Sequence, residues 1–236
     1  MHYNLKFVCI QNETYRYLGY DPERTQNWDS VDLLFNQLCQ ELSSKFIPFG
    51  YIKTYDLNVQ DQAMTIETPM PWQLESQDLK KHFEDCQKVS LIALTLGTEF
   101  DDFLAESLQQ DAYTKAVMAD AMGSAAAEEA ANQLSAIVKE LAEAQGFNIT
   151  SRYSPGYGDL PLDKNQNILQ SLKDDEPKIK TLESFLLSPR KSITALIGWH
   201  QEKDRAWVSA NCTSNCQICT FYNCPYRKTK NLKDVN

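Results

Sequence analysis

The pattern of apolar and polar positions alternates along the chain between helical and extended spacing. Between residues 31 and 42, apolar side chains recur at helical spacing, which predicts an amphipathic helix capped by Asp29 or Ser30. Residues 46–70 then alternate between apolar and polar side chains, which indicates strands with one face toward solvent. The run VSLIALTLG at 89–97 is nearly continuously apolar and ends at a glycine, so we expect a strand that is buried on both faces.

Two helices are predicted after this buried strand. Thr98 and Asp101 are spaced like a capping box, so Asp101 and Asp102 are expected to be carboxylates of a helix start. A polar role in a binding site is the alternative for these two carboxylates. Residues 111–145 predict a long alanine-rich helix with an apolar stripe, and Gly146 is placed to end it.

The first half of the alanine-rich helix contains the run AMGSAAAEEA, residues 121–130. Successive small side chains lower the radius of a helix, so another backbone or a ligand can approach it closely. Tight packing of the helix on a sheet is the simpler interpretation. Glu128 lies one position off the small-residue face, and periodicity alone predicts a solvated helix residue there.

The later part of the chain returns to short elements. Residues 165–172 predict a short helix, and SITALIGW at 192–199 predicts a strand that RAWVSA at 205–210 would extend into a hairpin. We therefore expect an α+β fold, with a mixed, mainly antiparallel twisted sheet flanked by helices and a Cys-rich C-terminal tail. No linker or repeat divides the chain, so residues 1–210 are expected to form one domain and residues 211–236 a metal-binding tail.

Composition and charge narrow the class of protein. A chain of 236 residues with 42% hydrophobic content can bury a sizeable core. The formal net charge of −9 argues against a protein that covers nucleic acid or anionic lipid with a general basic field. No apolar run approaches a membrane span, and the opening residues lack the features of a signal peptide, so the expected location is the cytoplasm.

Four of the seven cysteines lie close together near the C-terminus, in the spacing C-x3-C-x2-C-x4-C: Cys212, Cys216, Cys219 and Cys224. Four thiolates at this spacing can hold an iron–sulfur cluster or one tetrahedral zinc, and a flexible or disulfide-linked tail is the remaining alternative. The first three share the spacing of the radical S-adenosylmethionine loop. That interpretation is rejected, because too little chain follows Cys224 to build a barrel.

The other cysteines and the histidines show no ligand spacing. An odd number of cysteines without an export signal favours reduced thiols over a disulfide framework. We therefore expect Cys9, Cys39 and Cys86 to be small buried apolar residues. Three histidines are far apart in sequence and are expected to be surface or packing residues: His2, His82 and His200.

The stretch RYSPGYGDLPL, residues 152–162, combines turn chemistry with groups that bind ligands. Its Ser-Pro-Gly-Tyr segment predicts a type II turn with Gly156 at positive φ. Arg152 can clamp a carboxylate with two parallel hydrogen bonds, and Tyr153 and Tyr157 offer aromatic faces to a base or a cation. These groups suit an amino-acid–nucleotide hybrid; the alternative is a tight loop in which Arg152 pairs with Asp159.

RYSPGY resembles the Arg-x-x-x-Gly-Tyr signature of the S-adenosylmethionine-binding activation domain of cobalamin-dependent methionine synthase. RYSPGYGDLPL, TLESFLLSPRKSITALIG and AMGSAAAEEA are similar to stand-alone members of that family, and YRYLGY and LTLG look like its N-terminal and central segments. The similarity spans most of the chain. It is strongest between residues 111 and 199, where RxxxGY is followed by SPRKS.

The resemblance implies a site for S-adenosylmethionine. It places Arg152 on the methionine carboxylate, the Gly156–Tyr157 turn against the ligand, and Glu128 near the ligand's amino group, with Glu129 as the alternative carboxylate. The implied binding residues are Glu128, Arg152, Tyr153, Ser154, Gly156 and Tyr157. The family's N-terminal aspartate has no clear counterpart here, and Trp207 is only a loose candidate for a later tyrosine of the family.

The chemistry that the resemblance implies is reactivation of a corrinoid. An inactive Co(II) centre is reduced by one electron, and S-adenosylmethionine then methylates the Co(I) product, a reaction that needs positioning rather than a catalytic acid or base. No Asp-x-His-x-x-Gly segment is present to bind cobalamin. A corrinoid-carrying partner and an electron donor are therefore expected. The alternative function is a non-catalytic adaptor or electron-transfer protein on the same fold, carrying a metal or an iron–sulfur cluster.

Overall fold

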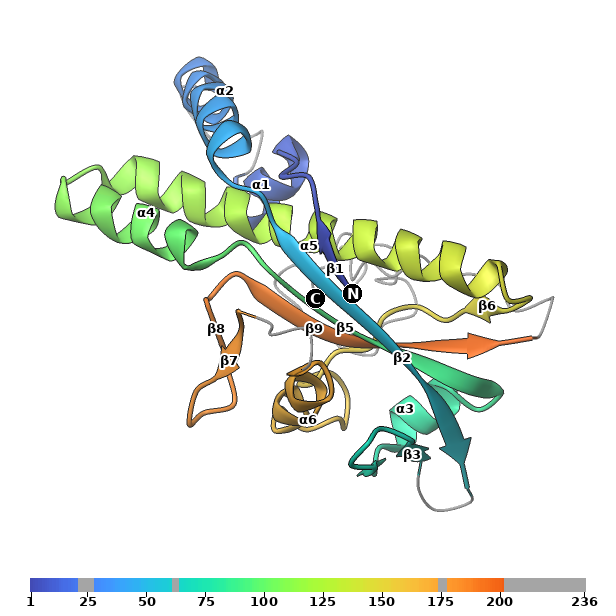
Figure 1. Cartoon of the computed structure of the whole chain (residues 1–236). Coiled ribbons are helices and arrows are strands. Elements are labelled where there is room, and N and C mark those ends of the chain that lie inside the picture. The colour runs from blue at the N-terminus through green and yellow to red at the C-terminus, as the bar shows by residue number, and fades with distance from the viewer. Residues whose placement is uncertain (21–27, 61–63, 174–177, 202–236) are drawn as a thin grey trace, which may run out of the picture.

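The computed structural model describes residues 1–20, 28–60, 64–173 and 178–201 (Figure 1). The helices are α1 (Gln11–Tyr17), α2 (Trp28–Lys45), α3 (Gln77–His82), α4 (Thr98–Gln109), α5 (Tyr113–Glu143) and α6 (Lys164–Ser171). The strands are β1 (His2–Asn4), β2 (Phe49–Val59), β3 (Met64–Ile66), β4 (Trp72–Leu74), β5 (Cys86–Thr95), β6 (Asn148–Ile149), β7 (Lys180–Thr181), β8 (Leu187–Ser188) and β9 (Ser192–His200).

One antiparallel sheet organises the described part of the chain. Its strand order is β4-β3-β2-β5-β9-β6, and β1 pairs with β2 off this path. All of these neighbours run antiparallel. Ile92 of β5 lies opposite both Ile52 of β2 and Ala195 of β9 in the register, at the centre of the sheet. The predicted class, a mainly antiparallel sheet flanked by helices, is confirmed.

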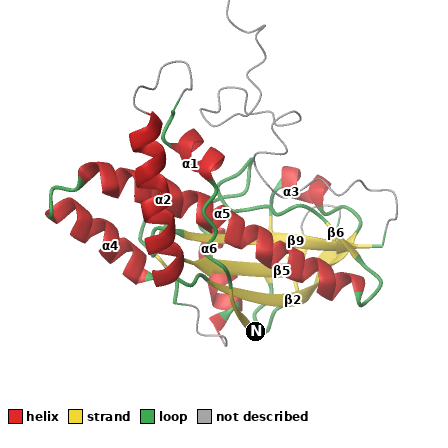
Figure 2. Cartoon of the chain, turned by 90° about the horizontal axis from the view of Figure 1, so that it is seen from above, coloured by secondary structure: helices red, strands yellow, loops and turns green. Residues whose placement is uncertain are grey.

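Alternation along β5 divides the core into two layers. Ile92 and Leu94 belong to the cluster beneath α5, whereas Leu91 and Ala93 belong to the cluster on the opposite face. Figures 1 and 2 show α5 crossing one face of the sheet, while α6 lies on the other. Every residue from 89 to 95 is buried, as predicted for a strand covered on both faces.

The long helix α5 confirms the alanine-rich prediction and owes its position to small side chains. It begins later than predicted, after Asp111, whose positive φ of 56° turns the chain. Gly146, at φ 78°, follows the helix as predicted and donates its N–H to the Glu143 carbonyl at 3.0 Å. A Cβ at Gly123 would overlap the Phe100 ring, so the small-residue run does permit tight packing.

The predicted caps of two helices are wrong. α2 begins at Trp28, so Asp29 and Ser30 lie inside the helix rather than before it. α4 is preceded by Gly97, at φ 90°, and has no side-chain cap. Asp101 does not complete a capping box, because its carboxylate turns toward the loop before β9 and accepts the Arg190 N–H.

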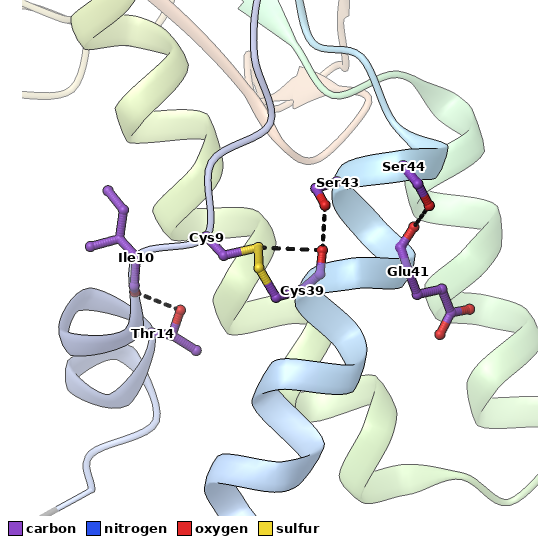
Figure 3. Close-up of a disulfide and its surroundings, with 7 residues drawn as sticks. All are labelled: Cys9, Ile10, Thr14, Cys39, Glu41, Ser43 and Ser44. Atoms are coloured by element: carbon purple, nitrogen blue, oxygen red, sulfur yellow. Dashed lines mark hydrogen bonds between the residues drawn. A yellow bond between two sulfur atoms is a disulfide. The ribbon is translucent and has the colours of Figure 1, made fainter.

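The prediction of separate, buried apolar cysteines is wrong for two of the three. Cys9, in the segment before α1, forms a disulfide with Cys39 of α2, across a Cα–Cα distance of 5.8 Å (Figure 3). Both side chains are half-buried. Folding of α1 against α2 brings the two cysteines together, and their sequence separation of 30 gave no indication of it. Cys86 of β5 is buried, as predicted.

The described ranges contain no helix long and apolar enough to cross a membrane. They also contain no group of three or more His, Cys, Asp or Glu side chains that could hold a metal ion. His2 is exposed, His82 is half-buried, and His200 is buried in β9, in agreement with surface or packing roles. The predicted hairpin strand at 205–210, Trp207 and the four tail cysteines lie outside the described residues.

Candidate functional site

The segment that precedes the Ser-Pro-Gly-Tyr turn runs along the free edge of β9. Tyr153 and Leu196 exchange two backbone hydrogen bonds, each of 2.9 Å, and the Thr150 N–H bonds to the Gly198 carbonyl at 2.9 Å. Neighbouring side chains of an extended segment point to opposite faces of a sheet. Tyr153 packs against the core cluster on the face opposite α5, so Arg152 projects to the other face, beneath α5.

Arg152 and Glu128 meet on that face. The Arg152 Nη2 atom lies 3.0 Å from Glu128 Oε2 and hydrogen-bonds to it. The arginine side chain is only 6% exposed, whereas the glutamate side chain is 41% exposed. The guanidinium of this pair is therefore buried, whereas solvent can reach the carboxylate. Glu129, the alternative carboxylate, instead accepts a hydrogen bond of 2.8 Å from Asn132 on its own helix.

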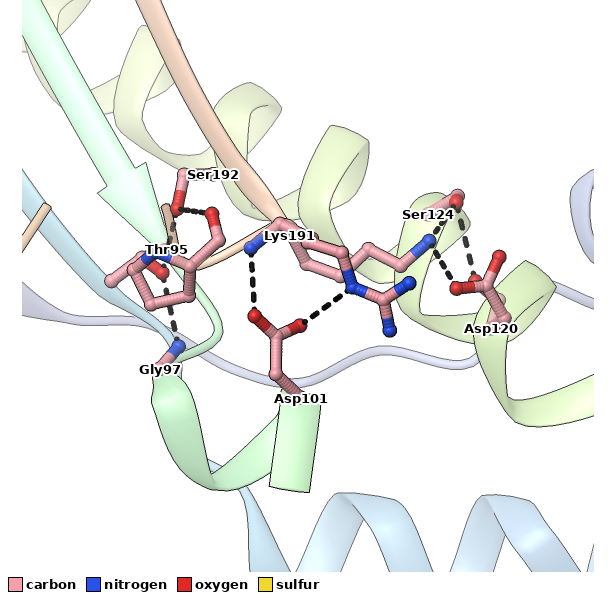
Figure 4. A network of polar contacts seen from close by, with 9 residues as sticks. Thr95, Gly97, Asp101, Asp120, Ser124, Lys191 and Ser192 are labelled. Atoms are coloured by element: carbon pink, nitrogen blue, oxygen red, sulfur yellow. Dashed lines mark hydrogen bonds and ion pairs between the residues drawn. The ribbon is translucent and has the colours of Figure 1, made fainter. Parts of the chain in front are cut away.

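The same face of α5 carries two further polar residues that the sequence did not single out. Asp120, Ser124 and Glu128 follow one another at intervals of four residues and so share one side of the helix. Lys191 approaches the first two: its Nζ lies 2.9 Å from Asp120 Oδ1 and 2.8 Å from Ser124 Oγ (Figure 4). Two mostly buried cations, Arg152 and Lys191, thus lie against one side of the helix.

The SPRKS segment, residues 188–192, is held by this contact and by two others. Asp101 of α4 accepts the Arg190 N–H at 2.9 Å, and its Oδ1 atom lies 3.5 Å from Arg190 Nε. Ser192 Oγ bonds to Thr95 Oγ1 at 2.8 Å, which fixes the end of β5 to the start of β9. Asp101 thus lies in the first turn of α4, as predicted for a carboxylate of the helix start, and it also binds the SPRKS segment.

We expect Lys191→Ala to lower the free energy of unfolding by about 1 to 2 kcal/mol, because the lysine is mostly buried and bonds to two groups on α5. Asp120 is half-exposed and can be solvated by water after the change, which keeps the loss moderate. Urea unfolding measures the effect. Lys180→Ala, at an exposed position of β7, is the matched control and should stay within about 0.5 kcal/mol of wild type; equal losses in both variants would contradict this role of Lys191.

The predicted turn is present, and its own amides are engaged. Tyr157 N–H donates to the Ser154 carbonyl at 3.2 Å, and Gly156 adopts φ 92°, as a type II turn requires. Gly156 N–H donates to the Leu160 carbonyl at 2.8 Å. These two amides therefore form hydrogen bonds within the loop. The Tyr157 side chain is 56% exposed beside the turn.

Asp159 anchors the loop to another helix instead of pairing with Arg152. Its carboxylate accepts hydrogen bonds from the Ser76 hydroxyl and from the Gln77 N–H, the latter at 2.6 Å, at the start of α3. The Ser76 hydrogen bond is the main reason that the pKa of Asp159 lies below its ordinary value. The alternative of an Arg152–Asp159 pair is therefore wrong.

Tyr153 lies on the α3 side of the loop, apart from the Arg152–Glu128 pair. Its ring centroid is 5.6 Å from that of His82, and its hydroxyl donates to the Tyr157 carbonyl at 3.4 Å. Burial, followed by the charges of Asp78 and Asp159, raises the pKa of Tyr153 to about 12. The structure thus brings Arg152 and Glu128 together but directs Tyr153 into packing.

The raised pKa of Tyr153 predicts a loss of stability in alkali. Below pH 10 the tyrosine is protonated in both the folded and the unfolded chain, and its contribution to stability is fully present. Between pH 10 and about 12 the unfolded chain releases the proton while the folded protein retains it, so stability falls as pH rises. We expect Tyr153→Phe to lessen the difference between urea midpoints at pH 9 and pH 11. Tyr113→Phe, at an exposed helix start, is the control; no difference between the two variants would refute the prediction.

Tyr17, at the end of α1, is a neighbour of the site that sequence reasoning did not assign. Burial, and then the charge of Glu128, raise the pKa of its hydroxyl. The Arg16 guanidinium lies 4.5 Å from the centroid of its ring. The segment YRYLGY contributed only to the family resemblance, and nothing in its own spacing indicated that its last helical tyrosine approaches Glu128.

A separate hollow of about 590 Å³ lies near the start of β5 and contains none of the predicted ligand residues. It is lined by Leu57, Val59, Glu84, Asp85, Cys86, Gln87 and Gln201. Because its lining carries two carboxylates and no basic side chain, it does not suit the carboxylate of an amino acid. The Arg152–Glu128 pair therefore remains the candidate site.

Comparison with known proteins supports the fold. No protein-family model matches the chain. No curated protein matches it either. Among solved structures, the chain is similar to the MetH reactivation domain bound to AdoHcy, with a TM-score of 0.65 and 17% sequence identity, over 89% of this chain and 80% of that chain. At this identity the similarity shows a common fold, in agreement with the α+β architecture.

Proposed function

We propose that this protein binds S-adenosylmethionine and supports the reductive methylation of a corrinoid carried by a partner protein. The observation that carries the proposal is the Arg152–Glu128 pair, placed beneath a helix of small residues in the fold of a reactivation domain. The similar structure was solved with AdoHcy, the demethylated form of S-adenosylmethionine. The fold and the pair of charges thus support the same ligand class.

The pair suits the amino-acid end of this ligand. A free α-amino acid group carries a carboxylate and an ammonium on one carbon, and the two protein charges are 3.0 Å apart. Arg152 would bind the carboxylate and Glu128 the ammonium, each through charge-assisted hydrogen bonds. Arg152 is buried, so its hydrogen bonds act in a medium of low dielectric, and Glu128 is exposed enough to admit a ligand from solvent.

The Ser-Pro-Gly-Tyr turn would then form one wall of this binding site. Gly156 and the exposed Tyr157 ring lie a few residues after Arg152, where an aromatic face can stack on a planar base. Ser154 belongs to the same turn through its carbonyl, which accepts the Tyr157 N–H. These three residues remain proposed contacts, whereas Tyr153 is proposed to support the loop from behind.

The chain supplies position rather than an acid or a base. The sulfonium of S-adenosylmethionine makes its methyl group electrophilic, and the reduced cobalt of a partner's corrinoid attacks the methyl carbon. The carbon–sulfur bond breaks with its electron pair on sulfur, which leaves S-adenosylhomocysteine and a methylated cobalt. The electron that first reduces Co(II) comes from a separate donor. The role of this protein is to hold the methyl group in line with cobalt.

A methylation assay tests the function. Cobalamin in the Co(II) state, bound to the corrinoid module of a methionine synthase that lacks its own reactivation domain, is mixed with a low-potential electron donor and S-adenosylmethionine. We expect methylcobalamin, followed by its absorbance, to form only after the full-length protein is added. The Arg152→Ala variant should suppress this formation. Equal rates with and without the protein would refute the proposed function.

A further inference from the structure

The Cys9–Cys39 disulfide closes a loop that contains the whole of α1. Cys9 precedes α1, and Cys39 lies on α2, so residues 10 to 38 are held between the two sulfur atoms (Figure 3). Both cysteines are half-buried and pack against the edge of the core cluster beneath α5. A disulfide of this kind limits the positions that α1 can take relative to α2.

The segment just before this loop is attached to α5 close to the candidate site. Gln133 of α5 exchanges two hydrogen bonds with the backbone of Lys6, of 2.9 and 3.0 Å, just before Cys9. Figure 1 shows α1 beside α5. Thr14 on α1 is fully buried, and Tyr17 at the end of this helix lies within the electrostatic reach of Glu128. The position of α1 therefore shapes the surroundings of the Arg152–Glu128 pair.

A second link between α1 and α2 does not depend on the disulfide. The Tyr15 hydroxyl bonds to the Asp32 carboxylate, and the Gln11 amide bonds to the same oxygen at 3.1 Å. These hydrogen bonds would hold α1 near its place in a reduced protein. We therefore expect reduction to loosen α1 without detaching it from α2. The affinity of the site for a ligand should fall but should not be lost.

We propose that the Cys9–Cys39 disulfide is a redox control of ligand binding: the oxidised pair ties the start of α1 to α2 and so limits the movement of α1 beside α5, so that the protein binds S-adenosyl ligands more tightly when oxidised than when reduced. The inference rests on the proposed function. In the reduced protein α1 samples more positions, and a ligand must order it on binding, which lowers affinity.

The redox step is a thiol–disulfide exchange with a dithiol reductant. One thiolate of the reductant attacks a sulfur of the disulfide and forms a mixed disulfide, and its second thiol displaces the protein sulfur. Two electrons and two protons pass to the protein, which gains two thiols, while the dithiol becomes a disulfide. No methyl group or cobalt takes part in this exchange.

Ligand affinity in the two redox states tests the proposal. S-adenosylhomocysteine is titrated into the full-length protein, first oxidised and then reduced by excess dithiothreitol, with thiols at Cys9 and Cys39 mapped by mass spectrometry. We expect binding to be about threefold to tenfold weaker after reduction. The double variant Cys9→Ser/Cys39→Ser should bind like the reduced protein under both conditions, which separates this pair from the other cysteines.

Each other outcome is decisive. Equal affinity in both states, or tighter binding after reduction, would overturn the redox control. Free thiols at both positions in the air-oxidised protein would overturn it as well. If the wild type binds the ligand in neither state, the proposed function fails, and amide hydrogen exchange across residues 11–17 then decides the redox part: we expect faster exchange after reduction, and unchanged exchange would overturn it.

Discussion

Arg152→Ala is expected to weaken the binding of S-adenosylmethionine by about 100-fold or more, the loss typical of removing one partner of a buried, hydrogen-bonded charge pair. The side chain is almost completely buried and meets Glu128 at 3.0 Å. Removing it leaves the ligand's carboxylate facing Glu128 without a cation, so the like charges repel. Equilibrium dialysis with labelled ligand measures the change.

Two further variants separate this role from a general effect of charge or stability. Arg152→Lys keeps the charge but loses the paired donors of the guanidinium, and we expect it to recover only part of the affinity. Lys139→Ala removes a positive charge from an exposed part of α5, where the lysine pairs with Glu143, and should bind like wild type. Similar losses in Arg152→Ala and Lys139→Ala would remove Arg152 from the site.

Gly123→Val is expected to lower the free energy of unfolding by about 2 to 3 kcal/mol, the cost of overpacking a dense core. A side chain at this position would overlap the Phe100 ring, which is fully buried. That ring cannot move freely, because its centroid lies 5.1 to 6.4 Å from the centroids of three other rings: Phe7, Phe46 and Phe103. Urea unfolding measures the loss.

The matched control for this change is Ala136→Val, at an exposed position of the same helix. It introduces the same side chain and should cost only the difference in helix propensity, about 0.6 kcal/mol. The double variant Gly123→Val/Phe100→Ala should be less destabilised than the sum of its single changes, because the new side chain fills part of the space that Phe100 leaves. Strict additivity would contradict the contact between these two positions.

The predictable parts of the fold are those in which one sequence pattern has one physical solution. The apolar run at 89–97 can be solvated on neither face, so it had to become a central strand, and β5 is that strand. The alanine-rich stretch could only be a helix that packs closely, and α5 does so. Helix starts were less predictable, because Asp101 had a tertiary partner, Arg190, that local spacing does not reveal.

The candidate site was predictable only in part for the same reason. A family resemblance placed Arg152 and Glu128 around one ligand group, and their direct ion pair follows from the alternation of Arg152 and Tyr153 along the edge of β9. The contacts of Tyr17 depend on how α1 packs, and the Cys9–Cys39 disulfide depends on the same packing. Neither has a local sequence pattern.

Arg152 is proposed to bind the carboxylate of S-adenosylmethionine, and removing that carboxylate from the ligand tests this role directly. Titration calorimetry compares S-adenosylmethionine with its decarboxylated analogue on wild-type protein and on Arg152→Ala. We predict that wild type prefers the intact ligand by about 100-fold, and that the variant binds both ligands with nearly equal, weak affinity. The same preference in both proteins, or no binding by wild type, would contradict the claim.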